Sequence, residues 1–282
     1  MKPREQKNDS FSPIRLKKRL GQHILKDKAI LGEIAEACDI REDTTILEIG
    51  AGVANLTEAL AKRAQKVIAV EIDPRFRLYH VRLLTRHPNI EFLYENIMDL
   101  KLEAMEELSH TEDLVIAGNI PYQITSPLVM KILESGLGWR RMVLMVQKEL
   151  AMRLTAPPGG KETSAISLKI RYFCETSVLR TVKSQAFRPP PRVDSAIAIF
   201  TPREEQPFSV ERRREFFRLL EGAFSQRRKT ILNSLGHALA GGVSRKQLAE
   251  ELESVGIDPG LRAENITLEQ YYGLFERLGQ NV

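Results

Sequence analysis

The 282-residue sequence has little of what marks secreted or membrane proteins. It contains only two cysteines, Cys38 and Cys174, in unrelated contexts. This excludes a disulfide framework and favours the reducing cytoplasm. The longest stretch without charge, Leu114–Met130, is interrupted by glycine, asparagine and proline, so it cannot form a continuous apolar helix across a bilayer. No apolar segment follows the basic N-terminus, and we therefore expect neither a secretory signal nor a membrane contact.

A metal site is not indicated either. The five histidines show no metal-ligand spacing with one another or with the two cysteines. Hydrophobic residues make up 43% of the chain and charged residues 28%, which excludes a disordered or collagen-like protein and leaves enough apolar material for a core. The length suits one large domain, or a catalytic domain with a small appendage.

Positive charge is concentrated near the two ends of the chain. The formal net charge is +5, and residues 1–30 carry nine Lys or Arg against three acidic residues. A second cluster, Arg227, Arg228 and Lys229, has no acidic neighbour between residues 222 and 235. Two solvated faces would explain these clusters, and contact with the phosphates of a nucleic acid is the alternative. Charge alone does not decide between them.

The apolar pattern alternates between strands and helices over the first two thirds of the chain. Predicted strands are Thr45–Ile49, Lys66–Ile72, Ile90–Tyr94, Leu114–Ala117, Met142–Val146 and Ala196–Phe200, and predicted helices include residues 29–38 and 55–64, the second with Asn55 as its N-cap. This alternation predicts a doubly wound α/β sheet. Helical, charged segments follow Pro202. We therefore expect a catalytic domain with a basic N-terminal arm at residues 1–203 and a helical domain at 204–282.

A glycine-rich turn follows the first predicted strand of the sheet. Residues 48–52 (Glu-Ile-Gly-Ala-Gly) lead into a helix whose N-terminus offers free N–H groups to a ligand. Glu71 closes the next strand, 21 residues after Gly50, where nucleotide-binding folds place a ribose-binding carboxylate. Asn55 replaces the last glycine of the dinucleotide motif, so S-adenosylmethionine fits better than NAD. Glu48 is either solvated or interacts with the amino-acid portion of that cofactor.

Asn119-Ile120-Pro121-Tyr122 follows another predicted strand, at the sheet edge where open α/β folds bind ligands. An exocyclic adenine amine is a poor nucleophile because its lone pair is delocalised into the ring. The Asn119 side-chain oxygen and a neighbouring backbone carbonyl can accept its two N–H bonds and favour a pyramidal, attacking nitrogen. Tyr122 can stack on an extracted base. An ordinary loop with a turn-forming Asn and Pro is the alternative.

Five segments resemble, in order along the chain, motifs of the ribosomal RNA adenine-N6 methyltransferase family. Arg19–Leu25 is similar to the opening G-Q-[NH]-F-L, Asn119–Tyr122 to N-[IL]-P-Y, Met145–Glu149 to M-x-Q-x-E, Phe187–Ser195 to F-x-P-x-P-x-V-x-S, and Phe224–Thr230 to F-x-x-R-R-K. The last element favours the KsgA-type small-subunit dimethyltransferases. The erythromycin-resistance methyltransferases, which act on large-subunit rRNA, are the alternative within the family.

The resemblance implies a Rossmann-like class I S-adenosylmethionine-dependent methyltransferase sheet with a small all-helical C-terminal domain. It implies methyl transfer from S-adenosyl-L-methionine, leaving S-adenosyl-L-homocysteine, to N6 of two adjacent adenosines near the 3′ end of 16S rRNA. The partner would be the 30S subunit or its precursor, with a role in small-subunit biogenesis, and the enzyme a cytoplasmic monomer. Implied cofactor contacts are Gln22, His23, Leu25, Glu48, Gly50, Gly52, Glu71, Ile72, Asn96 and Asn119. Asn119–Tyr122 would hold the target adenine and Phe187 would flank it. The N-terminal arm and a C-terminal helix carrying Arg227, Arg228 and Lys229 would bind RNA.

The sequence departs from the family pattern at several cofactor positions. Ala54 stands where the third glycine is usual, and Ile24 where the opening motif has phenylalanine. Asn96 aligns with the aspartate that holds the cofactor's adenine amine, and Asp99 would replace it if the register shifts. A neutral acceptor forms a weaker hydrogen bond than a charged one, so we expect weakened cofactor binding.

Two further functions stay open. The altered cofactor positions allow an RNA-binding ribosome-assembly factor with weak or no catalysis, although the intact Asn119–Tyr122 segment argues against it. A NAD-type oxidoreductase is opposed by Asn55 and by the absence of an acid–base pair for hydride transfer.

Overall fold

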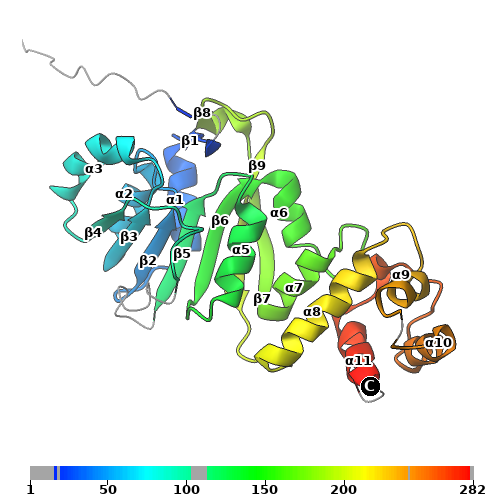
Figure 1. Cartoon of the computed structure of the whole chain (residues 1–282). Coiled ribbons are helices and arrows are strands. Elements are labelled where there is room, and N and C mark those ends of the chain that lie inside the picture. Colours follow the sequence, from blue (N-terminus) through cyan, green and yellow to red (C-terminus); the bar gives the residue numbers. More distant parts are fainter. Residues whose placement is uncertain (1–15, 18–19, 103–112, 241, 280–282) are drawn as a thin grey trace, which may run out of the picture.

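The computed structural model describes residues 16–17, 20–102, 113–240 and 242–279. Its centre is a seven-stranded sheet with helices on both faces, and further helices lie beyond one sheet edge (Figure 1). The strands of the sheet are β2 (Thr45–Ile49), β3 (Lys66–Val70), β4 (Ile90–Leu93), β5 (Leu114–Asn119), β6 (Arg141–Gln147), β7 (Cys174–Val182) and β9 (Ser195–Pro202). A separate antiparallel pair joins β1 (Ile24–Leu25) to β8 (Phe187–Arg188).

The order of the strands in the sheet is β4-β3-β2-β5-β6-β9-β7. The strands from β4 to β6 are parallel, whereas β9 runs antiparallel to both β6 and β7. β2 lies between β3 and β5, so the chain crosses the sheet in opposite directions on either side of it. Such a switch point opens a crevice at the carboxyl ends of the strands, where ligands bind in open α/β sheets.

Successive strand residues point to opposite faces, and each face has its own apolar cluster. In β2, Ile46 packs with α1 (Lys28–Ala37) and α2 (Asn55–Ala61), whereas Leu47 belongs to the cluster on the other face. Helix α3 (Arg77–Leu84) lies on the same face of the sheet as α1 and α2. The opposite face is covered by α5 (Thr125–Glu134), α6 (Lys148–Leu154) and α7 (Ala165–Phe173). The result is a three-layer α/β arrangement.

The C-terminal region is helical throughout its described part. It contains α8 (Val210–Phe224), α9 (Ile231–Ala238), α10 (Arg245–Ser254) and α11 (Leu268–Gly279), beside the β7 end of the sheet (Figure 1). The change from strands to helices follows Pro202, where β9 ends. The two regions share one apolar cluster, and the Tyr172 hydroxyl of α7 donates a 2.9 Å hydrogen bond to Phe208 O. A domain boundary at residue 203 therefore stays a prediction.

The structure corrects several local predictions. β7 was not predicted, because this strand at the sheet edge alternates polar and apolar residues and has no apolar run. Ala54, not Asn55, is the N-cap of α2, and its backbone adopts φ 66°. Arg227, Arg228 and Lys229 are exposed in the turn between α8 and α9 rather than on a helix. Of the nine Lys or Arg in residues 1–30, six lie outside the described residues, so most of the positive charge of the predicted basic arm is not described.

Candidate active site

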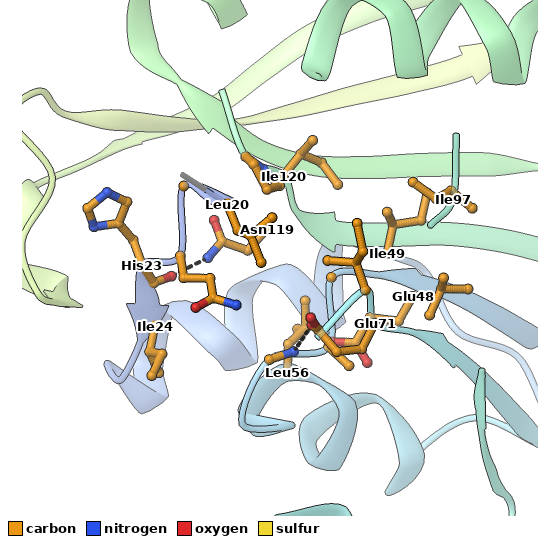
Figure 2. A pocket seen from close by; sticks show the side chains of 18 of the residues that line it. Leu20, His23, Ile24, Glu48, Ile49, Leu56, Glu71, Ile97, Asn119 and Ile120 are labelled. Carbon is orange, nitrogen blue, oxygen red and sulfur yellow. Dashed lines mark hydrogen bonds between the residues drawn. The ribbon is translucent and has the colours of Figure 1, made fainter. Parts of the chain in front are cut away.

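A cavity of about 270 Å³ opens beside the ends of β2, β3 and β5 (Figure 2). This volume is near the lower end of the range for small-molecule sites. All the predicted cofactor and adenine residues line it: Gln22, His23, Leu25, Glu48, Gly50, Gly52, Glu71, Ile72, Asn96, Asn119, Ile120, Pro121, Tyr122 and Phe187. Arg227, Arg228 and Lys229 do not line it. The fold thus brings segments from the first and last thirds of the sheet region to one place.

The turn after β2 has an unusual backbone. Gly50, Gly52 and Ala54 all have positive φ, at 83°, 55° and 66°. Two side chains hold Gly52 from opposite sides: its N–H donates to Glu71 Oε2 at 2.8 Å, and its carbonyl accepts from His80 Nε2 at 2.8 Å. These hydrogen bonds stabilise a conformation that L side chains rarely adopt.

His80 was not singled out from the sequence. It is fully buried, and burial lowers its pKa, so the ring is neutral. Because the Gly52 carbonyl can only accept, Nε2 carries the proton, and Nδ1 accepts from the Tyr94 hydroxyl at 2.7 Å. The ring also stacks on Phe92, with 3.8 Å between centroids. No local pattern would have indicated this role, because the partner of His80 lies 28 residues away.

Glu71 follows β3 and contacts two backbone amides. Oε2 accepts from Gly52 N and Oε1 from Asp73 N, each at 2.8 Å. Burial is the largest influence on its pKa and raises it. A carboxylate has about four acceptor positions, so Glu71 can still accept from a hydroxyl donor. This chemistry fits a ribose.

Glu48 is buried at the end of β2, with 1% of its surface exposed. Burial raises its pKa to about 7 and the charge of Glu71 adds to the shift, whereas Thr57 opposes it. Glu48 Oε2 has no hydrogen-bond partner within the described part of the chain. A buried carboxylate is stable only when it is paired or protonated, so this atom suits a cationic or hydrogen-bond-donating group in the cavity.

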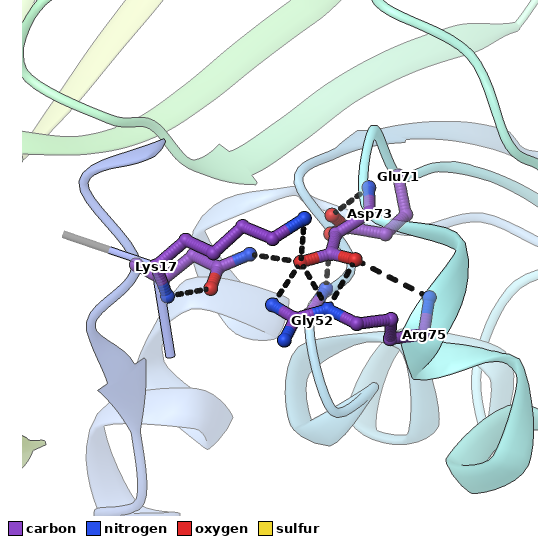
Figure 3. A network of polar contacts seen from close by, with 6 residues as sticks. Lys17, Gly52, Glu71, Asp73 and Arg75 are labelled. Carbon is purple, nitrogen blue, oxygen red and sulfur yellow. Dashed lines mark hydrogen bonds and ion pairs between the residues drawn. The ribbon is translucent and has the colours of Figure 1, made fainter. Parts of the chain in front are cut away.

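A polar network ties the N-terminal segment to this turn (Figure 3). Gln22 Nε2 donates to Asp73 Oδ2 at 3.1 Å, and Lys17 N donates to Gln22 Oε1 at 2.8 Å. Asp73 also binds Arg75, whose hydrogen bonds hold the pKa of the aspartate well below its usual range. The amide of Gln22 is therefore occupied by protein groups at both ends. Asp73 was not singled out from the sequence.

Asn119 is the last residue of β5. Its Nδ2 donates to the main-chain carbonyl of His23 at 2.8 Å, which fixes the orientation of the amide and leaves Oδ1 as an acceptor (Figure 2). The preceding Gly118 is required by close packing, because a Cβ there would lie 2.5 Å from Ile49 O. The strand can therefore place Asn119 directly beside the turn after β2.

Tyr122 and Phe187 differ in accessibility. The Tyr122 hydroxyl lies 3.1 Å from Ser195 Oγ, and the residue is half-buried. Phe187 pairs with Leu25 in the β1–β8 ladder and is only 2% exposed. The phenylalanine therefore presents little of its ring to a base, whereas the tyrosine presents more.

The Asn96 side chain is held in a local turn at the cavity. Its Oδ1 accepts from Met98 N at 3.1 Å, and its Nδ2 donates to Asp99 Oδ2 at 2.9 Å. Asn96 lines the cavity, whereas Asp99 lines a separate depression. Of these two residues, Asn96 therefore lies at the site and Asp99 does not.

Comparison with known proteins identifies the family. The model of the family described as ribosomal RNA adenine dimethylase matches residues 14–280. The chain belongs to this family. Ribosomal RNA small subunit methyltransferase A of Geobacillus thermodenitrificans is 39% identical over 265 residues, which cover 93% of this chain and 90% of that protein. The protein of the same name from Shouchella clausii is 38% identical with the same coverage of both chains.

Solved structures agree with the assignment to the ribosomal RNA adenine dimethylases. A dimethyladenosine transferase from Plasmodium falciparum superposes with a TM-score of 0.75 and 29% identity, covering 91% of this chain and 98% of that one. The structure of the 23S rRNA methyltransferase ErmE superposes with a TM-score of 0.73 and 27% sequence identity. The match covers 91% of this chain and 100% of that one. The predicted family, the Rossmann-like α/β fold and the methyltransferase activity on ribosomal RNA adenine are thus confirmed. The erythromycin-resistance type of methyltransferase does not match this chain better than the small-subunit type does.

Within the described residues, no helix has the length and apolar character needed to cross a membrane.

Proposed function

We propose that this dimethylase transfers methyl groups from S-adenosylmethionine to N6 of two adjacent adenosines near the 3′ end of 16S rRNA. The substrate would be the 30S subunit or its precursor, and the product N6,N6-dimethyladenosine. The observation that carries the proposal is the fixed amide of Asn119, whose Oδ1 stays available beside the cavity. The names of the relatives at 38–39% identity support the small subunit as the target.

The cavity residues fit the proposed cofactor. Glu71 would accept from the ribose hydroxyls, Glu48 would face the amino group, and Asn96 would accept from the adenine amine. The cofactor supplies an electrophilic methyl group. Glu48 supports the fit best, because its buried Oε2 has no partner among the described residues and a cationic amine would provide one.

The protein's own part in the reaction is to position one amine. Asn119 Oδ1 and the main-chain oxygen of Ile120 would accept the two N–H bonds of the target nitrogen, leaving its lone pair directed into the cavity. Tyr122 would stack on the extracted base. A strong general base is not required, because the nitrogen loses its proton readily once it has become cationic.

Contact with RNA would come from the turn between α8 and α9. Arg227, Arg228 and Lys229 are exposed there, and no carboxylate forms an ion pair with them within the described ranges. Replacing Arg227 and Arg228 by Ala should weaken 30S binding and reduce the salt slope, log Kd against log salt, by about 1–2. Cofactor affinity should not change, and an unaltered salt slope would refute this contact.

A single chain in the cytoplasm would be the acting unit. One chain supplies every residue named at the cavity, so the site needs no second copy.

The experiment is methylation of 30S particles that lack the modification, with labelled S-adenosylmethionine, followed by nucleoside analysis. Wild-type protein should form dimethyladenosine, and Asn119→Ala should reduce the rate by at least about 100-fold. Asn265→Ala, an exposed position in the C-terminal region, is the matched control. Tight 30S binding without methylation would instead make the protein an assembly factor, whereas methylation of 23S rRNA alone would assign it to the large subunit.

A further inference from the structure

The carboxylate of Asp73 is buried one layer behind the cavity. Its side chain is 0% exposed and does not line the cavity, whereas Gln22 and Glu71 do. Its Oδ2 accepts from Gln22 Nε2 at 3.1 Å and lies 3.6 Å from Lys17 Nζ, and both of its oxygens accept from the Arg75 guanidinium (Figure 3). A buried carboxylate is stable only with such partners, so Asp73 holds two segments of the chain together.

The segment that Asp73 holds is one wall of the cavity. Residues 20–25 all line the cavity. Gln22 reaches Asp73 across 51 positions of the sequence, and its Oε1 accepts from Lys17 N at 2.8 Å. One donor and one acceptor of the Gln22 amide are thus used within the protein. The amide therefore connects the wall to Asp73.

The main chain of Asp73 contacts the opposite side of the cavity. Its N–H donates to Glu71 Oε1 at 2.8 Å, and Glu71 Oε2 accepts from Gly52 N at the same distance. Asp73 is therefore joined both to the carboxylate that fits a ribose and to the N-terminal wall that faces it.

The far end of this wall is held without Asp73. Asn119 Nδ2 donates to the carbonyl of His23 at 2.8 Å, and Asn55 Nδ2 donates to the carbonyl of Leu25 at 2.7 Å. Loss of the contact between Asp73 and the wall would therefore loosen the part of the wall before residue 23. The amide of Asn119 would keep its own anchor.

We propose that Asp73 is a positioning residue for the cofactor. Through the amide of Gln22 it holds the N-terminal wall against the cavity, and this contact sets the affinity for S-adenosylmethionine rather than the rate of methyl transfer. A wall that is ordered before binding loses less conformational freedom when the cofactor arrives, which favours affinity. The inference rests on the proposed function for the identity of the cofactor.

Three substitutions separate this contact from the local role of Asp73. Asp73→Ser can still accept from Arg75 N, as Asp73 does at 3.3 Å, but its side chain is too short to reach Gln22. Asp73→Asn keeps an acceptor at full length. Gln22→Met removes the amide and keeps the length of the side chain. Asp258→Ser is the matched control, because the exposed Asp258 makes the same local contact, with Gly260 N at 2.7 Å, in the C-terminal region.

The Kd for S-adenosylmethionine is measured by calorimetry, and its KM and kcat are measured with unmethylated 30S particles at saturation. Asp73→Ser and Gln22→Met should each raise Kd and KM by about 10- to 100-fold and leave kcat within about threefold of wild type. Asp73→Asn should have a smaller effect than Asp73→Ser. The double variant Asp73→Ser/Gln22→Met should bind within about threefold of the weaker single variant, because both substitutions remove the same contact. Asp258→Ser should match wild type.

Three outcomes would overturn the inference. Losses that multiply in the double variant would show that Asp73 does not act through Gln22. A fall in kcat at unchanged KM would place the contact in the chemical step. An unchanged Kd in Gln22→Met would exclude the contact from cofactor binding, and this variant decides the question even if thermal unfolding shows that Asp73→Ser does not fold.

The same assays separate this inference from the proposed function. Binding of S-adenosylmethionine that depends on Asp73 and Gln22, without methylation of 30S particles, would keep the inference and reject the reaction. Methylation of 30S particles by variants with wild-type Kd and KM would keep the reaction and reject the inference.

Discussion

Asn119 Nδ2 donates a 2.8 Å hydrogen bond to the main-chain carbonyl of His23, 96 residues earlier in the chain. The residue proposed to hold the target amine is therefore held by the N-terminal segment that lines the cavity. The same segment is fixed at Leu25, whose carbonyl accepts from Asn55 Nδ2 at 2.7 Å. The end of β5, the start of α2 and the N-terminal segment thus form one connected structure.

This link makes Asn119→Asp informative. The carboxylate keeps an acceptor but cannot donate to the His23 carbonyl, and its charge faces that oxygen. We expect methylation to fall by at least about 100-fold. Hydrogen exchange should become faster at residues 20–26. Near-wild-type activity with unchanged exchange would show that the hydrogen bond does not position Asn119.

The raised pKa of Glu48, about 7, predicts a pH-dependent stability. The folded protein binds this proton more tightly than the unfolded chain, whose carboxyl titrates near 4.5. The free energy of unfolding therefore decreases as the pH rises from about 4.5 to 7. The Glu48→Gln variant has no carboxyl group at this position, so its stability does not show this decrease. In cofactor-free protein, the advantage of Glu48→Gln in unfolding free energy should grow by about 2–3 kcal/mol between pH 5 and pH 8.

Urea unfolding at the two pH values measures that change, with the exposed Glu42→Gln as the control. A pH-independent difference would show that Glu48 titrates normally. The same variant should bind S-adenosylmethionine more weakly, because the carboxylate that fits its amino group is gone.

His80 positions Gly52, and His80→Phe isolates that contact. Phenylalanine keeps the stack on Phe92 but removes the donor to the Gly52 carbonyl. We expect a loss of about 1–3 kcal/mol in unfolding free energy and weaker cofactor binding by calorimetry. Tyr94→Phe removes only the contact at Nδ1 and should change cofactor affinity less. Equal effects of the two variants would argue against specific positioning of the turn.

Ala54 occupies a left-handed conformation, with φ 66°, and is buried. Ala54→Gly relieves the strain but makes the unfolded chain more flexible, so the unfolding free energy should stay within about 1 kcal/mol of wild type. Ala54→Val should destabilise by about 2–4 kcal/mol, because a branched side chain meets both the strained backbone and a packed wall. Thermal unfolding of both variants checks this contrast. A tolerated valine would refute the backbone argument.

The sequence by itself determined the elements whose physical cause is local. The apolar strands, the glycine-rich turn, Glu71 and the Asn119–Tyr122 segment were all recognisable, because burial and backbone freedom leave patterns within a few residues. Glu48, Glu71 and Asn119 all lie at the ends of predicted strands, where open α/β sheets bind ligands, and the resemblance to the methyltransferase family assigned all three to the cofactor.

Only the tertiary structure decided how those groups are held. The pairs His23–Asn119, Gln22–Asp73 and His80–Gly52 join residues between 28 and 96 positions apart, and no periodicity records such a pair. Edge strand β7 was missed for a related reason, because one exposed face removes the apolar run that marks a buried strand. Hydrogen-bond partners are chosen by packing in three dimensions, and that choice settles which side chain faces the ligand and which holds its neighbour in place.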